Sequence, residues 1–153
     1  MKISASLYSN KERSLESLVT ELDKCHIDLF HIDSNDDLSV FDDIAEIRKI
    51  SSTPIDLHII SDEPEKYYDL IVQHQVEYVS FQYENFNGQK KEFPVSEGTS
   101  YGLAVISDTS VKVFEEYQDQ CDYVLIMTTT PGQSGGKFRK DNFKKIREFR
   151  NSF

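Results

Sequence analysis

The chain has 153 residues and a formal net charge of −10. This length suits one well-packed domain, and the acidic charge argues against nucleic acid, because phosphate backbones bind clustered Lys and Arg. No segment approaches the roughly 20 apolar residues of a membrane helix. The apolar stretch at the N-terminus is too short for a signal peptide, so we expect a cytoplasmic protein without a membrane partner. Cys25 and Cys121 lie far apart without metal-site spacing, which predicts free, buried thiols.

Short β-prone apolar runs alternate with helical segments along the chain. Strands are predicted at 2–8, 28–34, 55–61, 78–84, 100–107 and 121–129. Helices are predicted at 12–25, 38–50, 62–74, 108–120 and 141–153, where apolar residues recur at helical spacing. Asp62 is expected to cap the helix at 62–74, and Pro64 suits its first turn. The stretch 85–99 carries little helical signal.

Strands separated by helices imply parallel pairing and right-handed crossovers, and hence an α/β fold. No G-x-G-x-x-G follows the first strand, which disfavours a dinucleotide-binding Rossmann domain. A (β/α)8 TIM-barrel-type fold fits better, with about six of its eight βα units present. A barrel that stops there would leave two sheet edges open. We therefore expect residues 1–153 to form a single barrel domain that is incomplete at the C-terminus.

The run "DLFHIDSNDD" at 28–37 places polar groups inside an apolar strand. Side chains alternate faces along a strand, so His31 shares a face with Asp33, and His58 shares one with Asp56. If these strands are parallel neighbours, His31, Asp33 and His58 converge near their carboxyl ends. Two imidazoles and a carboxylate form a partial ligand set for Zn²⁺, Fe²⁺, Mn²⁺ or Co²⁺. Spacing alone leaves open the alternative that these histidines are core residues with satisfied hydrogen bonds.

The C-terminal third contains a glycine-rich loop and a basic segment, and each is considered as a possible ligand-binding site. In "TTTPGQSGGKF", residues 128–138, the glycines would let backbone amides face a ligand, although a plain strand-to-helix turn explains them equally well. The segment is no P-loop, because G-x-x-x-x-G-K-[ST] is absent. The basic segment 135–150 is interpreted as a solvated helix face interleaved with acids. A small phosphorylated substrate remains compatible with the acidic chain, because backbone amides and one local cation can bind it.

Several motifs in chain order resemble those of one known family. They are "ISASLYS", "LFHIDSNDD", "IDLHII" with "EPEKYYDLI", "YGLAVISDTSVKVFEEY", "CDYVLIMTTTPGQSGGKF" and "KKIREFR". Together they are similar to the motifs of the ribulose-phosphate 3-epimerase family of (β/α)8 barrels. The resemblance extends over essentially the whole chain, which matches the first and larger part of a typical member.

The resemblance implies a metal-dependent 3-epimerase of ribulose 5-phosphate or a related pentulose or hexulose phosphate. Such an isomerase removes a proton from C3 and returns it to the opposite face, through an enediolate. The family pattern makes His31, Asp33 and His58 ligands of one divalent metal (Zn, Fe, Mn or Co), and it makes Asp33 one of two catalytic carboxylates. It also implies that five residues contact the substrate: Ser6, Met127, Gly132, Ser134 and Gly135. Homo-oligomerisation is left open.

The chain also departs from the family pattern. Gln82 stands in place of a family histidine, and Asn35 and Ile60 replace methionines. The Asp-Gly-Gly motif of strand seven, which supplies the second catalytic carboxylate and a fourth metal ligand, is missing. These departures keep a second hypothesis open, a non-catalytic sugar-phosphate-binding or regulatory relative. A decarboxylase or synthase barrel is a weaker third option, since it would need a lysine at a strand end and none is predicted beyond Lys2.

Overall fold

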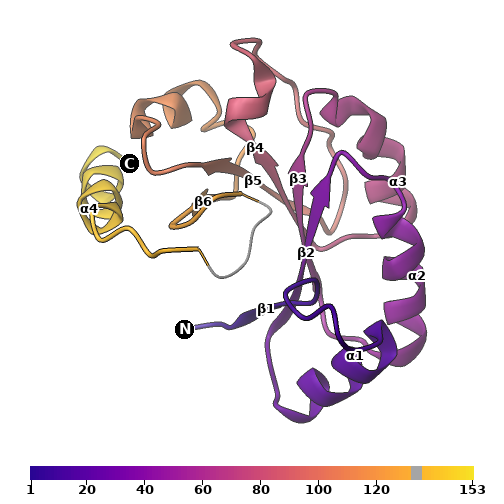
Figure 1. Ribbon diagram of the computed structural model, residues 1–153. Coiled ribbons are helices and arrows are strands. Elements are labelled where there is room, and N and C mark those ends of the chain that lie inside the picture. Colours follow the sequence, from indigo (N-terminus) through magenta and orange to yellow (C-terminus); the bar gives the residue numbers. More distant parts are fainter. Residues whose placement is uncertain (132–135) are drawn as a thin grey trace.

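A computed structural model describes residues 1–131 and 136–153 and shows six parallel strands in one curled sheet (Figure 1). The strands are β1 (Ser4–Ser6), β2 (Leu29–Asn35), β3 (Ile55–Ile60), β4 (Tyr78–Gln82), β5 (Ser100–Val105) and β6 (Tyr123–Ile126). Each strand pairs in parallel with the next one along the chain. The predicted α/β architecture is confirmed, and the curled sheet with its intervening helices is a partial (β/α)8 barrel.

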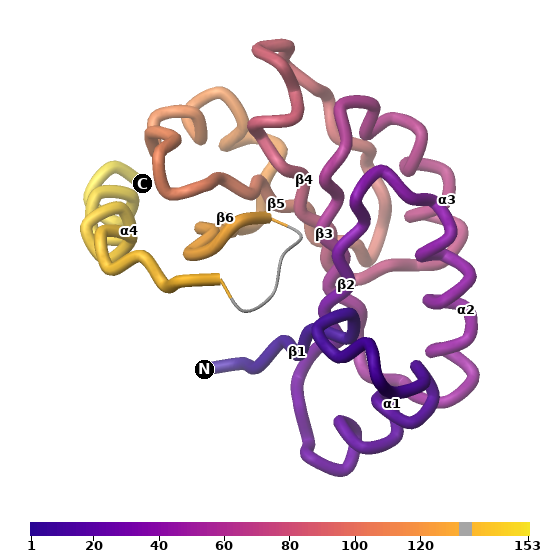
Figure 2. Tube along the Cα trace, viewed as in Figure 1, coloured from indigo at the N-terminus to yellow at the C-terminus, as the bar shows by residue number. Residues whose placement is uncertain are grey.

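All helical segments except the last connect consecutive strands, and the last follows β6. The α-helices are α1 (Leu15–Lys24), α2 (Val40–Ile50), α3 (Tyr68–Gln73) and α4 (Asn142–Ser152), and the 3₁₀ segments are η1 (Pro64–Tyr67), η2 (Tyr83–Phe86) and η3 (Val111–Glu116). Helices α1 to α3 lie along the outer side of β1–β4, whereas α4 lies on the opposite flank, beyond β6 (Figures 1 and 2). This places the inner side of the sheet away from α1 to α3.

Local sequence explains where α1 begins, and two expectations about helices were wrong. The Ser14 side chain accepts a hydrogen bond from the Ser17 amide at 3.3 Å, so it caps α1 as serine commonly does. Pro64 lies in the first turn of η1 as predicted, but Glu63 precedes that turn and no side chain caps it, so the prediction for Asp62 is wrong. The helix predicted at 108–120 is only the short 3₁₀ segment η3.

The outer face of the sheet forms the core. Six aliphatic or aromatic side chains on this face are fully buried: Phe30, Ile32, Ile55, Leu57, Ile59 and Val79. They meet the apolar faces of the covering helices, including Val19 of α1, Ile44 of α2 and Ile71 of α3, which are also fully buried. Burying each such side chain contributes about 1.5–3 kcal/mol to folding. The sequence therefore builds its core on one side of the sheet.

The inner face carries polar and small residues in register across the sheet. Asp33 is the pairing partner of His58, His58 of Ser80, Ser80 of Gly102, and Gly102 of Tyr123. Residues paired in neighbouring parallel strands point to the same face, so these five share one row. A Cβ atom at Gly102 would lie 2.6 Å from the ring of Tyr123, so the missing side chain makes room for that ring.

The cysteine prediction is confirmed in one part and wrong in another. Both cysteines are free, but Cys25 is exposed and Cys121 is only partly buried. Burial, with a smaller contribution from the charge of Asp122, raises the pKa of the Cys121 thiol to about 12. Within the described ranges, no helix is long and apolar enough to cross a membrane.

Candidate metal centre

Three side chains from β2 and β3 meet on the inner face of the sheet. His31 and Asp33 are two residues apart on β2, and His58 pairs directly with Asp33 from β3. One ligand atom from each residue lies within 4.8 Å of the other two. His58 is fully buried, and the His31 and Asp33 side chains are 18% and 20% exposed. The predicted convergence of these three residues is therefore confirmed.

The outward-facing nitrogen of His31 is already bonded to a carboxylate. His31 Nδ1 lies 2.9 Å from Asp56 Oδ2, and that oxygen also accepts a hydrogen bond from the Ser4 hydroxyl at 2.7 Å. An ionised carboxylate only accepts hydrogen bonds, so Nδ1 of His31 carries the hydrogen. The other nitrogen, Nε2, then faces Asp33 Oδ1 at 3.3 Å.

His58 is oriented in a corresponding way from β4. Its Nε2 lies 2.8 Å from Oε1 of Gln82, an acceptor, while its Nδ1 faces Asp33 Oδ1 at 3.0 Å. When each imidazole is neutral and carries its hydrogen on the outer nitrogen, the nitrogen nearest Asp33 has a lone pair, the state that a metal ligand requires. Metal-ligating histidines characteristically donate their other ring N–H to an outer partner in this way.

The chemistry of this donor set fits a divalent cation. Two lone-pair nitrogens and a carboxylate oxygen that face one another repel unless positive charge lies between them. Nitrogen and oxygen ligands of this kind bind Zn²⁺, Fe²⁺, Mn²⁺ and Co²⁺. The residues present therefore fit the metal that the family resemblance implies, without selecting one ion.

In the absence of a metal ion, a proton can reduce the repulsion among these three ligand atoms. Burial alone lowers the pKa of His31, but hydrogen bonds to Asp33 and Asp56 outweigh burial and raise it to about 9. For Asp33, burial raises the pKa, but the adjacent imidazoles of His31 and His58 outweigh this and hold it well below its usual range. Asp33 is thus ionised at neutral pH and available to a cation or a substrate proton.

The remaining residues of the predicted site lie at other strand ends or outside the described ranges. Ser6 ends β1 as the pairing partner of His31 and is partly buried. Met127 follows β6, and its amide donates to the Val105 carbonyl at 2.9 Å. Gly132, Ser134 and Gly135 fall outside the residues that the structure describes. Contact of these five residues with a substrate stays a prediction.

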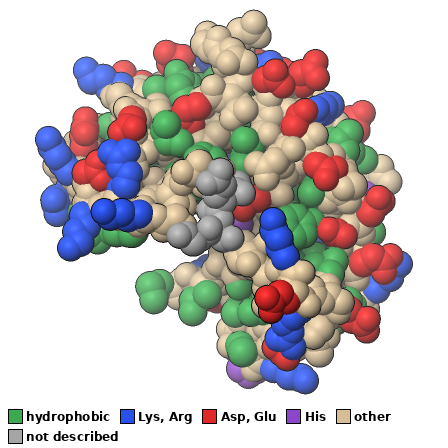
Figure 3. All heavy atoms as spheres, viewed as in Figure 1, with side chains coloured by type: hydrophobic (Ala, Val, Ile, Leu, Met, Phe, Trp, Pro, Cys, Tyr) green, Lys and Arg blue, Asp and Glu red, His purple; other side chains and the backbone are tan. Residues whose placement is uncertain are grey.

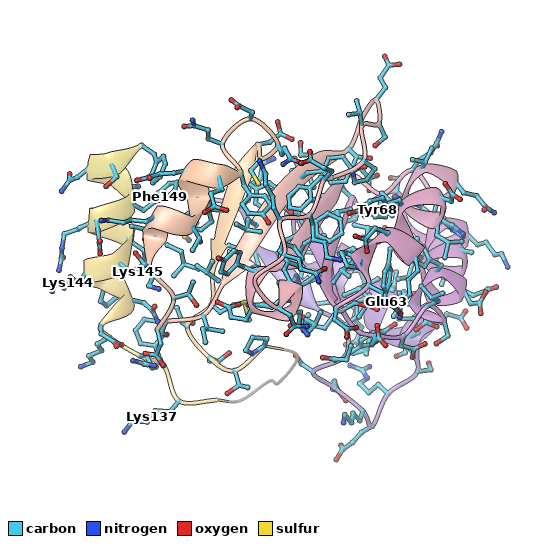
Figure 4. All side chains as sticks on the ribbon, turned by 90° about the horizontal axis from the view of Figure 1, so that it is seen from above. Glu63, Tyr68, Lys137, Lys144, Lys145 and Phe149 are labelled. Atoms are coloured by element: carbon cyan, nitrogen blue, oxygen red, sulfur yellow. The ribbon has the colours of Figure 1, made fainter. Side chains whose placement is uncertain are left out.

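A cavity of about 780 Å³ opens at the carboxyl ends of β5 and β6. Its described lining is Ile106, Ser107, Asp108, Thr129, Thr130, Pro131, Gly136, Lys137, Phe138, Arg139 and Lys140. Arg139 is paired with Asp108 at 2.9 Å and with Asp141 at 2.5 Å. Lys and Arg gather over α4 and the segment before it (Figure 3), and Lys137 and Lys144 point away from the body of the protein (Figure 4). This region is basic although the whole chain is acidic.

Comparison with known proteins identifies the family of this chain. The family model described as "Ribulose-phosphate 3 epimerase family" matches residues 2–153. This chain belongs to that family. Among its relatives, the ribulose-phosphate 3-epimerase of Aquifex aeolicus is 33% identical over 106 residues, which cover 68% of this chain and 48% of that protein. The ribulose-phosphate 3-epimerase of Bacillus subtilis is 26% identical over 156 residues, covering 97% of this chain and 72% of that protein.

A third epimerase relative, from Methanocaldococcus jannaschii, is 27% identical over 163 residues, covering 98% of this chain and 67% of that protein. The chain therefore spans about half of the Aquifex protein and about two-thirds to three-quarters of the other two. Membership of the epimerase family rests on the match along nearly the whole chain, not on any one motif.

Sequence reasoning assigned no role to four residues around the centre. Asp56 and Gln82 contact the two histidines, while Ser4 and Glu84 contact Asp56 and Gln82 in turn. The two-residue alternation that singled out His31 and Asp33 also places Gln82 on the face of Ser80, next to the strand of His58. That signal was available for Gln82, but the contact itself depends on side-chain orientation.

Proposed function

We propose that this epimerase-family protein acts in the 3-epimerisation of a ketose phosphate, ribulose 5-phosphate or a related pentulose or hexulose phosphate. The observation that carries the proposal is the convergence of His31, Asp33 and His58, with the outer nitrogen of each histidine already bonded to an acceptor. We assign these three residues as ligands of one divalent metal, Zn, Fe, Mn or Co. When bound, such an ion stabilises negative charge on substrate oxygens as a Lewis acid.

Asp33 is the group we assign to proton transfer. Its carboxylate is ionised because its pKa is held well below the usual range, and one oxygen faces both imidazoles. A substrate whose C3 lies near the free oxygen of Asp33 would lose its C3 proton to that oxygen and become an enediolate, which is general base catalysis. His31 and His58 hold the carboxylate in place during this step. Inversion is completed when an acid on the opposite face returns a proton to C3, the role that the family pattern gives to a second carboxylate, which residues 1–153 do not supply.

We place the rest of the substrate toward the carboxyl ends of the strands. Ser6, beside His31 at the end of β1, is assigned to a substrate hydroxyl. The cavity at the ends of β5 and β6, with Lys140 in its lining, suits the phosphate end of the sugar. A cytoplasmic location and a single, partial barrel domain over residues 1–153 complete the proposal.

Turnover assays with added Zn²⁺, Fe²⁺, Mn²⁺ or Co²⁺ test the proposal on ribulose 5-phosphate and other ketose phosphates. Asp33→Asn is expected to reduce turnover by about 10²–10⁴-fold, because an amide cannot take up the C3 proton. Asp28→Asn is the matched control: Asp28 accepts from the Ile3 amide at 2.7 Å, before β2 begins, and turnover should be unchanged.

The outcomes separate the two hypotheses. Metal-dependent turnover that Asp33→Asn abolishes supports the epimerase. Binding of a ketose phosphate without turnover, with any of the four metals, would instead establish the non-catalytic relative. Failure of the protein to bind any of the four metals would overturn the metal centre itself.

A further inference from the structure

An ion pair joins two segments of the lining of the cavity at the carboxyl ends of β5 and β6. Asp108 lies in the loop that follows β5, and Arg139 lies in the segment before α4. Nη1 of Arg139 is 2.9 Å from Oδ1 of Asp108. The two side chains are 43% and 72% exposed, so solvent reaches both charges. A cation that lines this cavity is therefore already paired with a carboxylate.

A second carboxylate holds the other nitrogens of the Arg139 guanidinium. The two oxygens of Asp141 accept from Nε at 3.3 Å and from Nη2 at 2.5 Å. Two parallel hydrogen bonds of this kind fix the orientation of a guanidinium as well as its position. Asp141 therefore orients Arg139, and Asp108 occupies Nη1, the nitrogen that Asp141 does not contact.

The contact between Arg139 and Asp108 is one that a phosphate can replace. Exposed ion pairs are weak, because water solvates both charges when they separate. A phosphate group brings up to two negative charges and several acceptor oxygens to the same guanidinium. The surrounding segment 137–150 carries seven Lys or Arg and only two Asp or Glu, and Lys140 of this segment also lines the cavity. The local charge therefore favours an anion, although the whole chain is acidic (Figure 3).

We propose that Arg139 binds the phosphate of the substrate in this cavity, and that Asp108 competes with the phosphate for Nη1 of Arg139. The inference rests on the proposed placement of the phosphate end in this cavity. It adds a residue that binds the phosphate and a carboxylate of the same chain that lowers the affinity for it. Asp141 is a positioning residue, because it holds the guanidinium through the other two nitrogens.

Affinity for inorganic phosphate tests the competition directly. It is measured by phosphorus-31 NMR titration at constant pH and ionic strength. Asp108→Asn keeps the shape of the side chain and removes its charge, so phosphate should bind about two- to five-fold more tightly, the range expected from the loss of one exposed ion pair. Arg139→Gln should weaken binding by about ten-fold or more, because it removes a charge-assisted hydrogen bond to the phosphate.

Glu65→Gln provides a matched control. Glu65 is 52% exposed and pairs with Lys91 at 2.9 Å, but it does not line the cavity. The variant changes the net charge of the protein by the same amount as Asp108→Asn and should leave phosphate affinity unaltered. Equal tightening in the two variants would overturn the inference, because net charge alone would then explain it.

A double variant separates competition from a general effect of the Asp108 charge on the cavity. In an Arg139→Gln background, Asp108→Asn should change phosphate affinity little, because the group for which the two anions compete is gone. An undiminished effect of Asp108→Asn in this background would overturn the inference. Weaker phosphate binding by Asp108→Asn alone would also overturn it, because Asp108 would then help Arg139 to bind phosphate.

The titrations need neither a metal ion nor turnover, so they separate this inference from the proposed function. Turnover of a ketose phosphate, with phosphate affinities that Asp108→Asn and Arg139→Gln leave unaltered, would overturn this inference alone. The expected phosphate affinities without turnover of any ketose phosphate would support this inference and count against the epimerase. Absence of phosphate binding by both the unaltered protein and Asp108→Asn would overturn the inference.

Discussion

The two faces of β2 and β3 have different roles, although their residues alternate along the same strands. On the outer face, Phe30, Ile32 and Leu57 are fully buried against helices and make no polar contact. On the inner face, between them in sequence, His31, Asp33 and their partners form a network of hydrogen bonds. Because successive side chains point to opposite faces, one strand can supply both burial and chemistry. The comparison predicts that changes on the two faces affect different measurements.

The largest effect on stability is expected on the outer face. Phe30→Ala should lower the free energy of unfolding by about 3–5 kcal/mol, through lost burial and the cavity left behind. Phe30→Leu should cost less, and the folded fraction of either variant should bind Zn²⁺ as the unaltered protein does. Urea unfolding measures the first quantity and chelator competition the second. A large loss of Zn²⁺ affinity in folded Phe30→Leu would show that the faces are not independent.

An intermediate loss of stability is expected where Gly102 lies against the ring of Tyr123 on the inner face. Gly102→Ala places a methyl group 2.6 Å from the ring of Tyr123, so we expect a loss of about 1–3 kcal/mol from overpacking. In a Tyr123→Ala background the same substitution should cost much less, because the ring is gone. Urea unfolding of the four proteins gives the coupling energy. Additive losses would mean that the ring does not determine the need for glycine.

The last effect is a pH dependence of stability from the inner face, with a slope of at most about 1.4 kcal/mol per pH unit for one group. The pKa of His31 is about 9 in the folded protein, because hydrogen bonds to Asp33 and Asp56 outweigh burial. The unfolded value is about 6.5. A raised pKa stabilises the fold fully below the unfolded value, so this stability should be lost as pH rises from about 6.5 through 9.

Urea unfolding of the metal-free protein in chelator between these pH values measures the slope. His31→Gln should remove it, whereas Phe30→Leu should keep it at lower overall stability. The same slope in His31→Gln would assign the pH dependence to another group.

Much of this arrangement was predictable from alternation alone. The strand order, the inner position of His31 and Asp33 and their meeting with His58 follow from apolar runs, residue spacing and parallel pairing. The register that sets Asp33 directly opposite His58 does not, because a shift of two residues would preserve every inside–outside pattern. Nor does the pairing of Gln82 with Glu84, which depends on the direction of one side-chain amide.

The errors have physical causes too. The 108–120 segment has apolar residues at helical spacing, yet Val111 and Phe114 already bury its apolar side within the short segment η3. Glu63, not Asp62, is the residue directly before η1, and no side chain caps that turn. In both cases local pattern competed with tertiary packing.

The ammonium group of Lys145 connects α4 to the loop that follows β5. Its Nζ donates to the backbone carbonyls of Ile106 at 2.8 Å and of Thr109, the same two residues whose donors hold Glu84. A line of contacts thus runs from α4 through Thr109, Glu84 and Gln82 to His58. The last helix is therefore connected, through hydrogen-bonded groups alone, to the residue that contacts His58.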